Sequence, residues 1–433
     1  MKHTVALIDW SHLIEDFLDN IGLSIDEFCQ DMTGGWMFGY IEALKSVGVS
    51  TVLFCFTTQV LQPKRVQHRP TGATIWLVPS PALYRNLRKC IPNPYASTVV
   101  EAAGEFSRLK TAWLYLLLQL APFLATPLRS LAKLLKQEGC TRLLCQDYEH
   151  ARFDLCVLLG FFLRIPVYAS FQGGNWQQSK FERPIRPFSL ARCAGLIIAS
   201  GIEQQRVIQE YRLNPAKIAQ TFNPIDLSMW NVKNQMEARE QLQLAPHAKI
   251  AIWHGRIDLK RKGLDVLLQA WALVLDRVDQ IAHPLHLYIL GNGNDHAAFA
   301  ALLKQQAMPS VTWLDTYLND RSLIATWLKA ADLYVFPSRH EGFPVAPIEA
   351  LASGLPLIAS DAPGIPDILA HGAESGGIMV PKNDAEALAK ALQLVLGEDK
   401  LRISLGKNAQ TRAESAFGLE NVGLQLKTFM QLS

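Results

Sequence analysis

Residues 331–367, ADLYVFPSRHEGFPVAPIEALASGLPLIASDAPGIPD, predict a strand, a polar loop, a short helix and a second strand. The apolar run 333–336 is stopped by a Pro-Ser pair, as expected at the end of a buried strand. From Val345 the spacing becomes helical, and Gly354 is a natural stop. Residues 357–359 then continue as a strand. A polar loop that leads from a strand into a helix presents unpaired backbone N–H groups, so this stretch predicts an anion site.

Two glutamates mark this stretch: Glu341 lies in the loop and Glu349, eight positions later, lies on the helix. The spacing and its surroundings resemble the E-x7-E signature of retaining nucleotide-sugar glycosyltransferases of family 4. The resemblance implies the GT-B fold, an α/β architecture of two Rossmann-like domains that face each other across a cleft. It also implies transfer of a sugar from a nucleotide-diphosphate sugar to an acceptor hydroxyl.

The resemblance assigns different tasks to the residues of the loop and the helix. Glu349 is expected to hold the ribose hydroxyls, because a carboxylate accepts hydrogen bonds from two vicinal hydroxyl groups. Glu341 is expected to face the hydroxyls of the sugar ring. The backbone between them is expected to face the phosphates, with one donor fewer at the proline: Gly342, Phe343, Pro344 and Val345.

A second motif begins at Gly255-Arg256 and ends at Lys262, directly after an apolar strand at 250–253. A guanidinium and an ammonium group six positions apart could hold a diphosphate from two sides. The stretch resembles the G-R-x5-K-G motif of the same family, which implies that Arg256 and Lys262 neutralise the leaving diphosphate. A solvated basic loop is the alternative, since two further cations lie between them. The strand–loop–helix context favours the binding site.

Two further positions resemble the donor side of the family. Gly291 follows a strand at 287–290, and Leu314 lies near the end of a strand at 311–315, where backbone groups are expected to receive the base. The family often has glycine where Asp315 stands. UDP, GDP and ADP sugars therefore all remain open.

The first half of the chain alternates strands and helices, which is typical of a parallel sheet covered on both faces. The expected strands are 5–8, 51–56, 75–78, 142–145, 167–170 and 196–199, and the expected helices include 36–47, 109–136 and 153–163. Residues 221–226 resemble the family segment that joins the two domains. We therefore expect an acceptor-side domain over 1–222, completed by a C-terminal helix within 415–433, and a donor-side domain over 223–414.

Polar clusters after the first-half strands are the acceptor-side candidates: Gly34, Gly35, His150, Gln172, Gly173 and Asn175. The family often has histidine at the position of Gln172, near the reacting carbon. Glutamine keeps the hydrogen bonds but does not titrate. His150 could compensate, although a lone loop histidine is more often exposed. A nucleotide-sugar-binding protein with little turnover therefore stays an alternative to the enzyme.

Charge is distributed unevenly along the chain. Residues 1–220 hold 23 Lys/Arg and 17 Asp/Glu (net +6), residues 221–433 hold 19 and 22 (net −3), and no acidic residue occurs from 43 to 100. The basic stretch is either a solvated surface or a face for an anionic acceptor or an acidic membrane. Three classes of acceptor remain open: a glycan, a lipid-linked molecule and a small molecule. No nucleic-acid partner is expected.

Several other classes of protein are disfavoured. The apolar segment 112–125 has 14 residues and is broken by Pro122, so we expect a buried helix rather than a membrane span, with peripheral membrane contact as the minority alternative. Seven cysteines without a C-x-x-C pair suggest neither disulfides nor zinc and favour the cytosol. The chain begins with a strand at 5–8 rather than a signal peptide.

The motifs also limit the cofactors. No D-x-D sequence is present, so the resemblance predicts catalysis without a metal and without a cofactor beyond the nucleotide sugar. A dehydrogenase is disfavoured because no strand is followed by G-x-G-x-x-G. A sugar phosphorylase shares the fold but would need pyridoxal phosphate.

Overall fold

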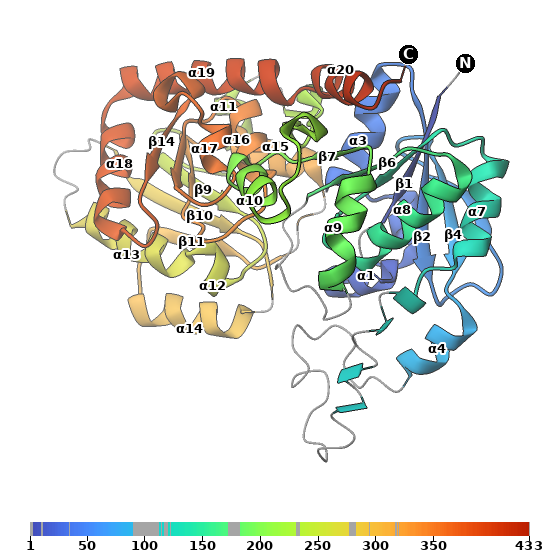
Figure 1. Cartoon of the computed structure of the whole chain (residues 1–433). Helices are drawn as coiled ribbons and strands as arrows, with labels where there is room; N and C mark the ends of the chain where they lie inside the picture. Colours follow the sequence, from blue (N-terminus) through green and yellow to red (C-terminus); the bar gives the residue numbers. More distant parts are fainter. Residues whose placement is uncertain are drawn as a thin grey trace. The chain divides into compact units, whose positions relative to one another are not determined.

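The structure is a computed structural model of the 433-residue chain. It describes residues 3–9, 12–33, 35–89, 112–113, 115–116, 120–121, 123–171, 182–230, 234–276, 283–293, 295–316, 318 and 320–432. The chain divides into two compact units, which Figure 1 colours along the sequence. Unit 1 consists of residues 1–199, 203–221 and 422–433, and unit 2 consists of residues 200–202 and 222–421.

Within its described part, unit 1 holds a sheet in the order β3-β4-β2-β1-β5-β6-β7-β8. The strands are β1 Thr4–Ile8, β2 Ser50–Thr57, β3 Lys64–Gln67, β4 Thr74–Pro79, β5 Arg142–Cys145, β6 Val167–Ser170, β7 Gly195–Ile197 and β8 Ile218–Ala219. All neighbours are parallel except the pair β3 and β4. Central strands such as β1 are buried and apolar, as expected when helices cover both faces of a parallel sheet.

Helices connect these strands (Figure 1). They are α1 Ile14–Ile21, α2 Ile25–Gln30, α3 Gly35–Ser46, α4 Ala82–Arg88, α7 Leu128–Gln137, α8 Ala151–Leu163, α9 Glu182–Arg192 and α10 Gly201–Tyr211. The continuous helix predicted over 109–136 is wrong in its described part, because the chain leaves the helical conformation at residues 125–127 and α7 begins at Leu128. Pro127 explains the break, since proline lacks an N–H group and disfavours a helical residue before it.

The C-terminal helix α20 Leu419–Phe429 packs on unit 1 from Val422 onward. A Cβ atom at Gly423 would lie 2.1 Å from the carbonyl oxygen of Ala43, so the backbones of α20 and α3 touch at this position. The chain end is held further by Arg142, whose Nε donates to the carbonyl of Met430 at 2.9 Å.

Unit 2 holds an all-parallel sheet in the order β11-β10-β9-β12-β13-β14 over its described residues. Its strands are β9 Lys249–His254, β10 Leu285–Leu290, β11 Val311–Leu314, β12 Leu333–Phe336, β13 Leu357–Ser360 and β14 Gly377–Val380. Its helices are α11 Gln235–Gln241, α12 Leu259–Lys262, α13 Leu264–Leu275, α14 His296–Gln306, α15 Arg321–Ala330, α16 Ala346–Ala352, α17 Ile365–Ile368, α18 Ala385–Gly397 and α19 Asp399–Phe417.

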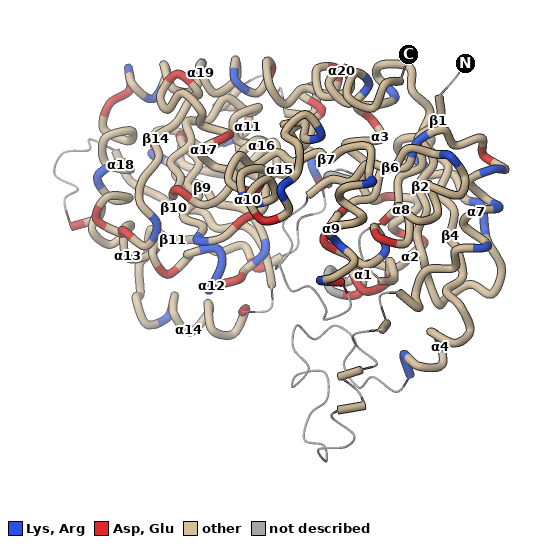
Figure 2. Tube along the Cα trace, in the orientation of Figure 1, with Lys and Arg blue, Asp and Glu red and all other residues tan. Residues whose placement is uncertain are grey.

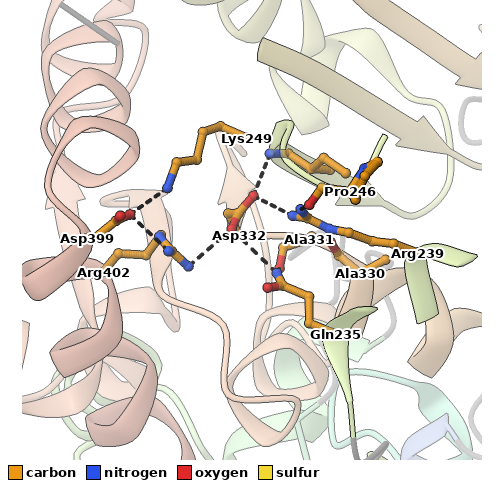
Figure 3. A network of polar contacts seen from close by, with 10 residues as sticks. Gln235, Arg239, Pro246, Lys249, Ala330, Ala331, Asp332, Asp399 and Arg402 are labelled. Carbon is orange, nitrogen blue, oxygen red and sulfur yellow. Dashed lines mark hydrogen bonds and ion pairs between the residues drawn. The ribbon is translucent and has the colours of Figure 1, made fainter. Parts of the chain in front are cut away.

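A buried carboxylate organises the amino end of β12 (Figure 3). Asp332 is 4% exposed and accepts hydrogen bonds from Arg239 Nη2 and from the backbone N–H of Ile250, each at 2.8 Å. Arg402 Nη1 lies 3.1 Å from its other oxygen. These contacts tie α11, β9 and α19 to the start of β12, whose opposite end leads into the loop of residues 337–345.

Candidate active site

The loops that follow β9 and β10 are in direct backbone contact. Gly291 has a φ of 139°, and a Cβ atom there would lie 1.9 Å from the carbonyl oxygen of Gly255. The backbone N–H of Gly255 donates to the carbonyl oxygen of Leu290 at 3.0 Å, which is a second backbone contact between the two loops. Only glycine allows two backbones to approach this closely in such a conformation. The glycines predicted for donor binding therefore shape the carboxyl edge of the sheet, where ligands of open α/β folds bind.

The interval between the two predicted cations is not an open loop. It contains the short helix α12, whose first turn is capped by Asp258 accepting from the N–H of Arg261 at 3.0 Å. The helix stops at Gly263, which has a φ of 63° and whose Cβ would lie 2.2 Å from the carbonyl oxygen of Pro337. The turn after α12 thus rests against the end of β12. Lys262 is consequently held on a helix and not in a flexible loop.

Lys262 and Glu341 form an ion pair between Nζ and Oε1 at 2.7 Å. The lysine ammonium also lies over the ring of Phe336, 5.8 Å from its centroid. The side chains are 19% and 9% exposed, so the pair is largely removed from solvent. A buried carboxylate needs such a partner, and the pair holds both groups at one place in the site.

Arg339 supports this arrangement from the same loop. Its Nη1 donates to the carbonyl of Leu259 at 2.7 Å and its Nη2 to Asp265 at 2.6 Å, while its N–H donates to the carbonyl of Arg261 at 2.7 Å. Arg339 therefore fastens the loop after β12 onto α12. The sequence did not single out this residue, because a charged loop residue shows no spacing signal of its own.

The middle of the loop is fixed by aromatic packing. The ring of Phe343 stacks on Phe222 with centroids 5.2 Å apart and an interplanar angle of 12°. Asn223 Nδ2 donates to the carbonyl oxygen of Phe343 at 3.3 Å. On the other side, a Cβ atom at Gly364 would lie 3.0 Å from the carbonyl oxygen of Gly342. The loop is thus packed on both sides before α16 begins at Ala346.

A cavity of about 230 Å³ lies at the ends of β9 and β10 within unit 2. Four of the residues predicted for donor binding or catalysis line it: Gly255, Arg256, Gly291 and Glu349. The side chain of Arg256 is 50% exposed, with Asp258 at 3.9 Å. The wall of the cavity is apolar, with Leu318, Ile324 and Trp327 among its residues. Charged groups at one side and an apolar wall suit a ligand with a phosphate part and a flat base.

One polar residue of the cavity was missed. His254, expected in a loop, is the last residue of β9, and its Nε2 lies 2.9 Å from Oε2 of Glu349. The hydroxyl of Tyr334 donates to the carbonyl of His254 at 3.1 Å, and burial raises the pKa of Tyr334 well above its usual value. His254 could have been predicted as a cavity residue, because it is a polar residue at the end of a buried strand and directly precedes Gly255-Arg256. Trp327 was missed as well, because its spacing with Ile324 and Leu328 fits an ordinary buried helix face.

Leu314 does not line the cavity. Its carbonyl accepts from the N–H groups of Gly291 at 3.1 Å and Thr316 at 2.9 Å, so it supports the loop after β10. Among the acceptor-side candidates, Gly34, Gln172, Gly173 and Asn175 lie outside the described residues. Gly35 begins α3.

His150, one of the acceptor-side candidates, is the N-cap residue of α8 and is partly buried. Burial, and next the nearby charge of His12, lowers the pKa of the His150 imidazole to about 3. The two rings meet edge to face with centroids 6.4 Å apart.

The basic stretch of unit 1 is partly compensated by acidic residues from other segments. Arg65 pairs with Glu138 at 3.2 Å, Arg88 with Asp16 at 2.5 Å, and Arg69 lies 4.0 Å from Asp31. Figure 2 shows acidic residues interspersed among the basic ones over this unit. The absence of acidic residues from 43 to 100 therefore does not translate directly into an uncompensated positive face.

The described residues contain neither a membrane-spanning helix nor a metal-binding cluster. No helix in the described ranges is both long and apolar enough to cross a membrane. In the same part of the chain, no three His, Cys, Asp or Glu side chains are grouped as a metal ion would require. The six described cysteines are free and buried.

Part of the second unit is similar to known proteins. Residues 248–398 match the family model of Glycosyl transferases group 1. A D-inositol 3-phosphate glycosyltransferase of Jonesia denitrificans is 31% identical over 227 residues, which cover 51% of this chain and 53% of the relative. The chain spans about half the length of the curated relatives it matches.

Solved structures match over nearly the whole chain. Sucrose-phosphate synthase from Thermosynechococcus elongatus aligns with a TM-score of 0.66 and 19% identity, covering 99% of this chain and 98% of that one. Anabaena HepE in complex with UDP aligns with a TM-score of 0.69 and 15% identity over 100% of both chains. At such identities the likeness establishes the fold alone. The chain has the GT-B fold, and residues 248–398 of its second unit match the model of Glycosyl transferases group 1.

Proposed function

We propose that the protein is a retaining glycosyltransferase that moves a sugar from a nucleoside-diphosphate sugar to an acceptor hydroxyl. One observation carries the proposal. A cavity lined by Arg256 and Glu349 lies in the domain that matches the group 1 family, and the same domain holds the buried pair of Lys262 and Glu341.

The proposed roles follow from charge and position. Arg256 and Lys262 stabilise the diphosphate as it leaves, since both can donate charge-assisted hydrogen bonds to phosphate oxygens. Glu341, held by Lys262, accepts from hydroxyls of the transferred sugar. Glu349 accepts from the ribose.

The proposed reaction breaks the bond between the anomeric carbon and the diphosphate oxygen and forms a bond from the acceptor oxygen to the same face of that carbon. The acceptor proton passes to the leaving phosphate oxygen, so no protein base is required. Negative charge develops on the diphosphate in this step, and preorganised cations lower its energy most in the transition state.

The relatives suggest which substrates to test first. HepE was solved with UDP, and also with UDP-glucose, so UDP sugars are the first donors to test here. Several curated relatives are named D-inositol 3-phosphate glycosyltransferases, which favours a small phosphorylated polyol as the first acceptor. Glycans and lipid-linked acceptors follow.

The decisive experiment combines binding and turnover. Thermal unfolding of the purified chain is measured with UDP, GDP and ADP; a nucleotide at a hundredfold over its dissociation constant should stabilise the protein by about 2.7 kcal/mol. The matching UDP-, GDP- or ADP-sugar is then incubated with acceptors, and the anomeric configuration of the product is read by NMR. An inverted product contradicts retention, and binding without hydrolysis or transfer contradicts the enzymatic proposal. Turnover that is unchanged in EDTA is expected if catalysis needs no metal.

A further inference from the structure

His254 is held rigidly beside the cavity. Its backbone is fixed on both sides by Tyr334, whose hydroxyl donates to the His254 carbonyl at 3.1 Å and accepts from the His254 backbone N–H with 3.4 Å between nitrogen and oxygen. The two rings also meet edge to face with centroids 5.3 Å apart. His254 is 9% exposed and lines the cavity together with Glu349. A side chain on a buried strand, fixed in this way, is well suited to set the position of a neighbouring group.

The contact with Glu349 determines where the imidazole carries its hydrogen. Nε2 lies 2.9 Å from the carboxylate oxygen Oε2 of Glu349. Because an ionised carboxylate only accepts, Nε2 must be the donor, and Nδ1 of the neutral ring is left as an acceptor. Nδ1 is buried, and it has no hydrogen-bond partner among the residues that the structure describes. A buried acceptor without a partner is costly and rare in native proteins, so its presence at the cavity needs an explanation.

A vicinal diol provides that explanation. Two neighbouring hydroxyls donate two hydrogens and need two acceptors in close proximity. With Oε2 of Glu349 engaged by His254, the carboxylate offers Oε1, and the unpartnered Nδ1 of His254 is the second acceptor.

We infer that His254 is a ribose-selecting residue: it fixes the carboxylate of Glu349 through Nε2 and accepts a hydrogen bond from a ribose hydroxyl of the nucleotide through Nδ1. The inference rests on the proposed binding of a nucleoside diphosphate in this cavity. It adds a second ribose contact to the one expected of Glu349. It also explains why a polar residue follows the apolar run 250–253 at the end of strand β9.

The test compares UDP with 2′-deoxy-UDP by calorimetric titration, with the GDP and ADP pairs measured in parallel. The wild-type protein should bind the ribonucleotide about tenfold more tightly than its deoxy counterpart, the effect expected of a lost hydrogen bond in a buried site. His254→Phe should weaken ribonucleotide binding and bring the two dissociation constants within about twofold of each other. Unchanged discrimination in His254→Phe overturns the inference.

Two further variants separate positioning from packing. His254→Gln keeps a donor that reaches Glu349, so it should recover part of the affinity lost in His254→Phe. In the Glu349→Gln background, His254→Phe should have less effect than it has in the wild type, because coupled residues are non-additive. Fully independent effects of the two substitutions contradict the assignment. His286→Phe, on the neighbouring strand β10 and outside the cavity lining, is the control and should leave both dissociation constants unchanged.

Failure of this inference is distinguishable from failure of the proposed function. If the wild-type chain binds none of UDP, GDP and ADP, the proposed function itself fails, and the inference with it. If the wild type binds one of them and His254→Phe, folded as judged by its thermal unfolding, still prefers the ribonucleotide, only the inference fails.

Discussion

The ammonium of Lys262 and the carboxylate of Glu341 form a 2.7 Å ion pair that joins α12 to the loop after β12. The two residues are 79 positions apart in sequence and come from two separate motifs. Their contact brings the two motifs together at one place in unit 2. It also gives Lys262 two tasks, since the cation that is proposed to bind the diphosphate already compensates a buried carboxylate.

Replacement of Lys262 by alanine should abolish transfer. The loss of a preorganised cation at a developing negative charge costs on the order of 2–4 kcal/mol, or about a thirty- to thousandfold decrease in kcat. Lys260→Ala is the matched control, because Lys260 lies on the same short helix and is exposed. Steady-state kinetics of both variants check the prediction. Near-normal turnover of Lys262→Ala would remove this lysine from the mechanism.

Gly263 should tolerate no side chain, because a Cβ atom would collide with the backbone of Pro337. Comparison with Gly372 separates this collision from the strain of a positive φ angle. Gly263 and Gly372 have similar φ angles, 63° and 54°, so alanine is strained at both by roughly 1–2 kcal/mol. A Cβ atom at Gly263 would lie 2.2 Å from the Pro337 carbonyl, whereas nothing lies within 4 Å at Gly372. Gly263→Ala should therefore unfold at a clearly lower urea concentration than Gly372→Ala and lose nucleotide binding. Equal stability of the two variants would show that the close contact is unimportant.

The strands of both units could largely be predicted, because buried parallel strands are continuous apolar runs bounded by turn residues. Residues 142–145, 167–170 and 333–336 were predicted with the observed bounds. Strand β3 was missed because its sequence is KRVQ: an edge strand with exposed charges has no apolar pattern. The helix α12 was missed because its four residues are too few to show a helical period.

For the candidate site, motif spacing identified cationic, acidic and glycine positions but not their contacts. The pairing of Lys262 with Glu341 depends on how two loops fold over one strand, which no local pattern reveals. The apolar wall around Trp327 looked like any buried helix face. His254 carried no signal beyond its place beside Gly255-Arg256.

The buried carboxylate of Asp332 should be essential for the stability of unit 2. Asp332→Asn keeps the shape but leaves Arg239 and Arg402 without their buried anion, and such losses cost about 3–5 kcal/mol. Asp399→Asn is the control. Hydrogen bonds from Lys249 and Arg402 lower the pKa of Asp399 to about 2, but its side chain is 61% exposed. An exposed pair contributes less than about 1 kcal/mol. Urea unfolding of both variants checks the ranking, and a larger loss in Asp399→Asn would contradict it.

The stability of unit 1 should depend on pH through two histidines. Burial, and next the charge of Arg152, lowers the pKa of His12 to about 4; burial, and next His12, lowers that of His150 to about 3. The unfolded chain takes up protons at these histidines below its usual pKa of about 6.5, whereas the folded chain does not. The histidines therefore contribute stability above that pH, and it is lost progressively as the pH falls toward 4 and 3.

Asp9 acts in the opposite direction, so the histidine effect must be measured as a difference between two proteins. Burial raises the pKa of Asp9 to about 7, so the folded state binds this proton first and gains stability as the pH falls from about 7 toward 3.8. The double variant His12→Gln/His150→Gln retains Asp9 and removes both imidazoles. The urea midpoint of the double variant minus that of the wild type should increase as the pH is lowered from about 7.5 to about 5. His247→Gln, which removes an exposed histidine, is the control. A parallel pH dependence of wild type and double variant would mean that these imidazoles are protonated in the folded protein, against the burial that lowers their pKa.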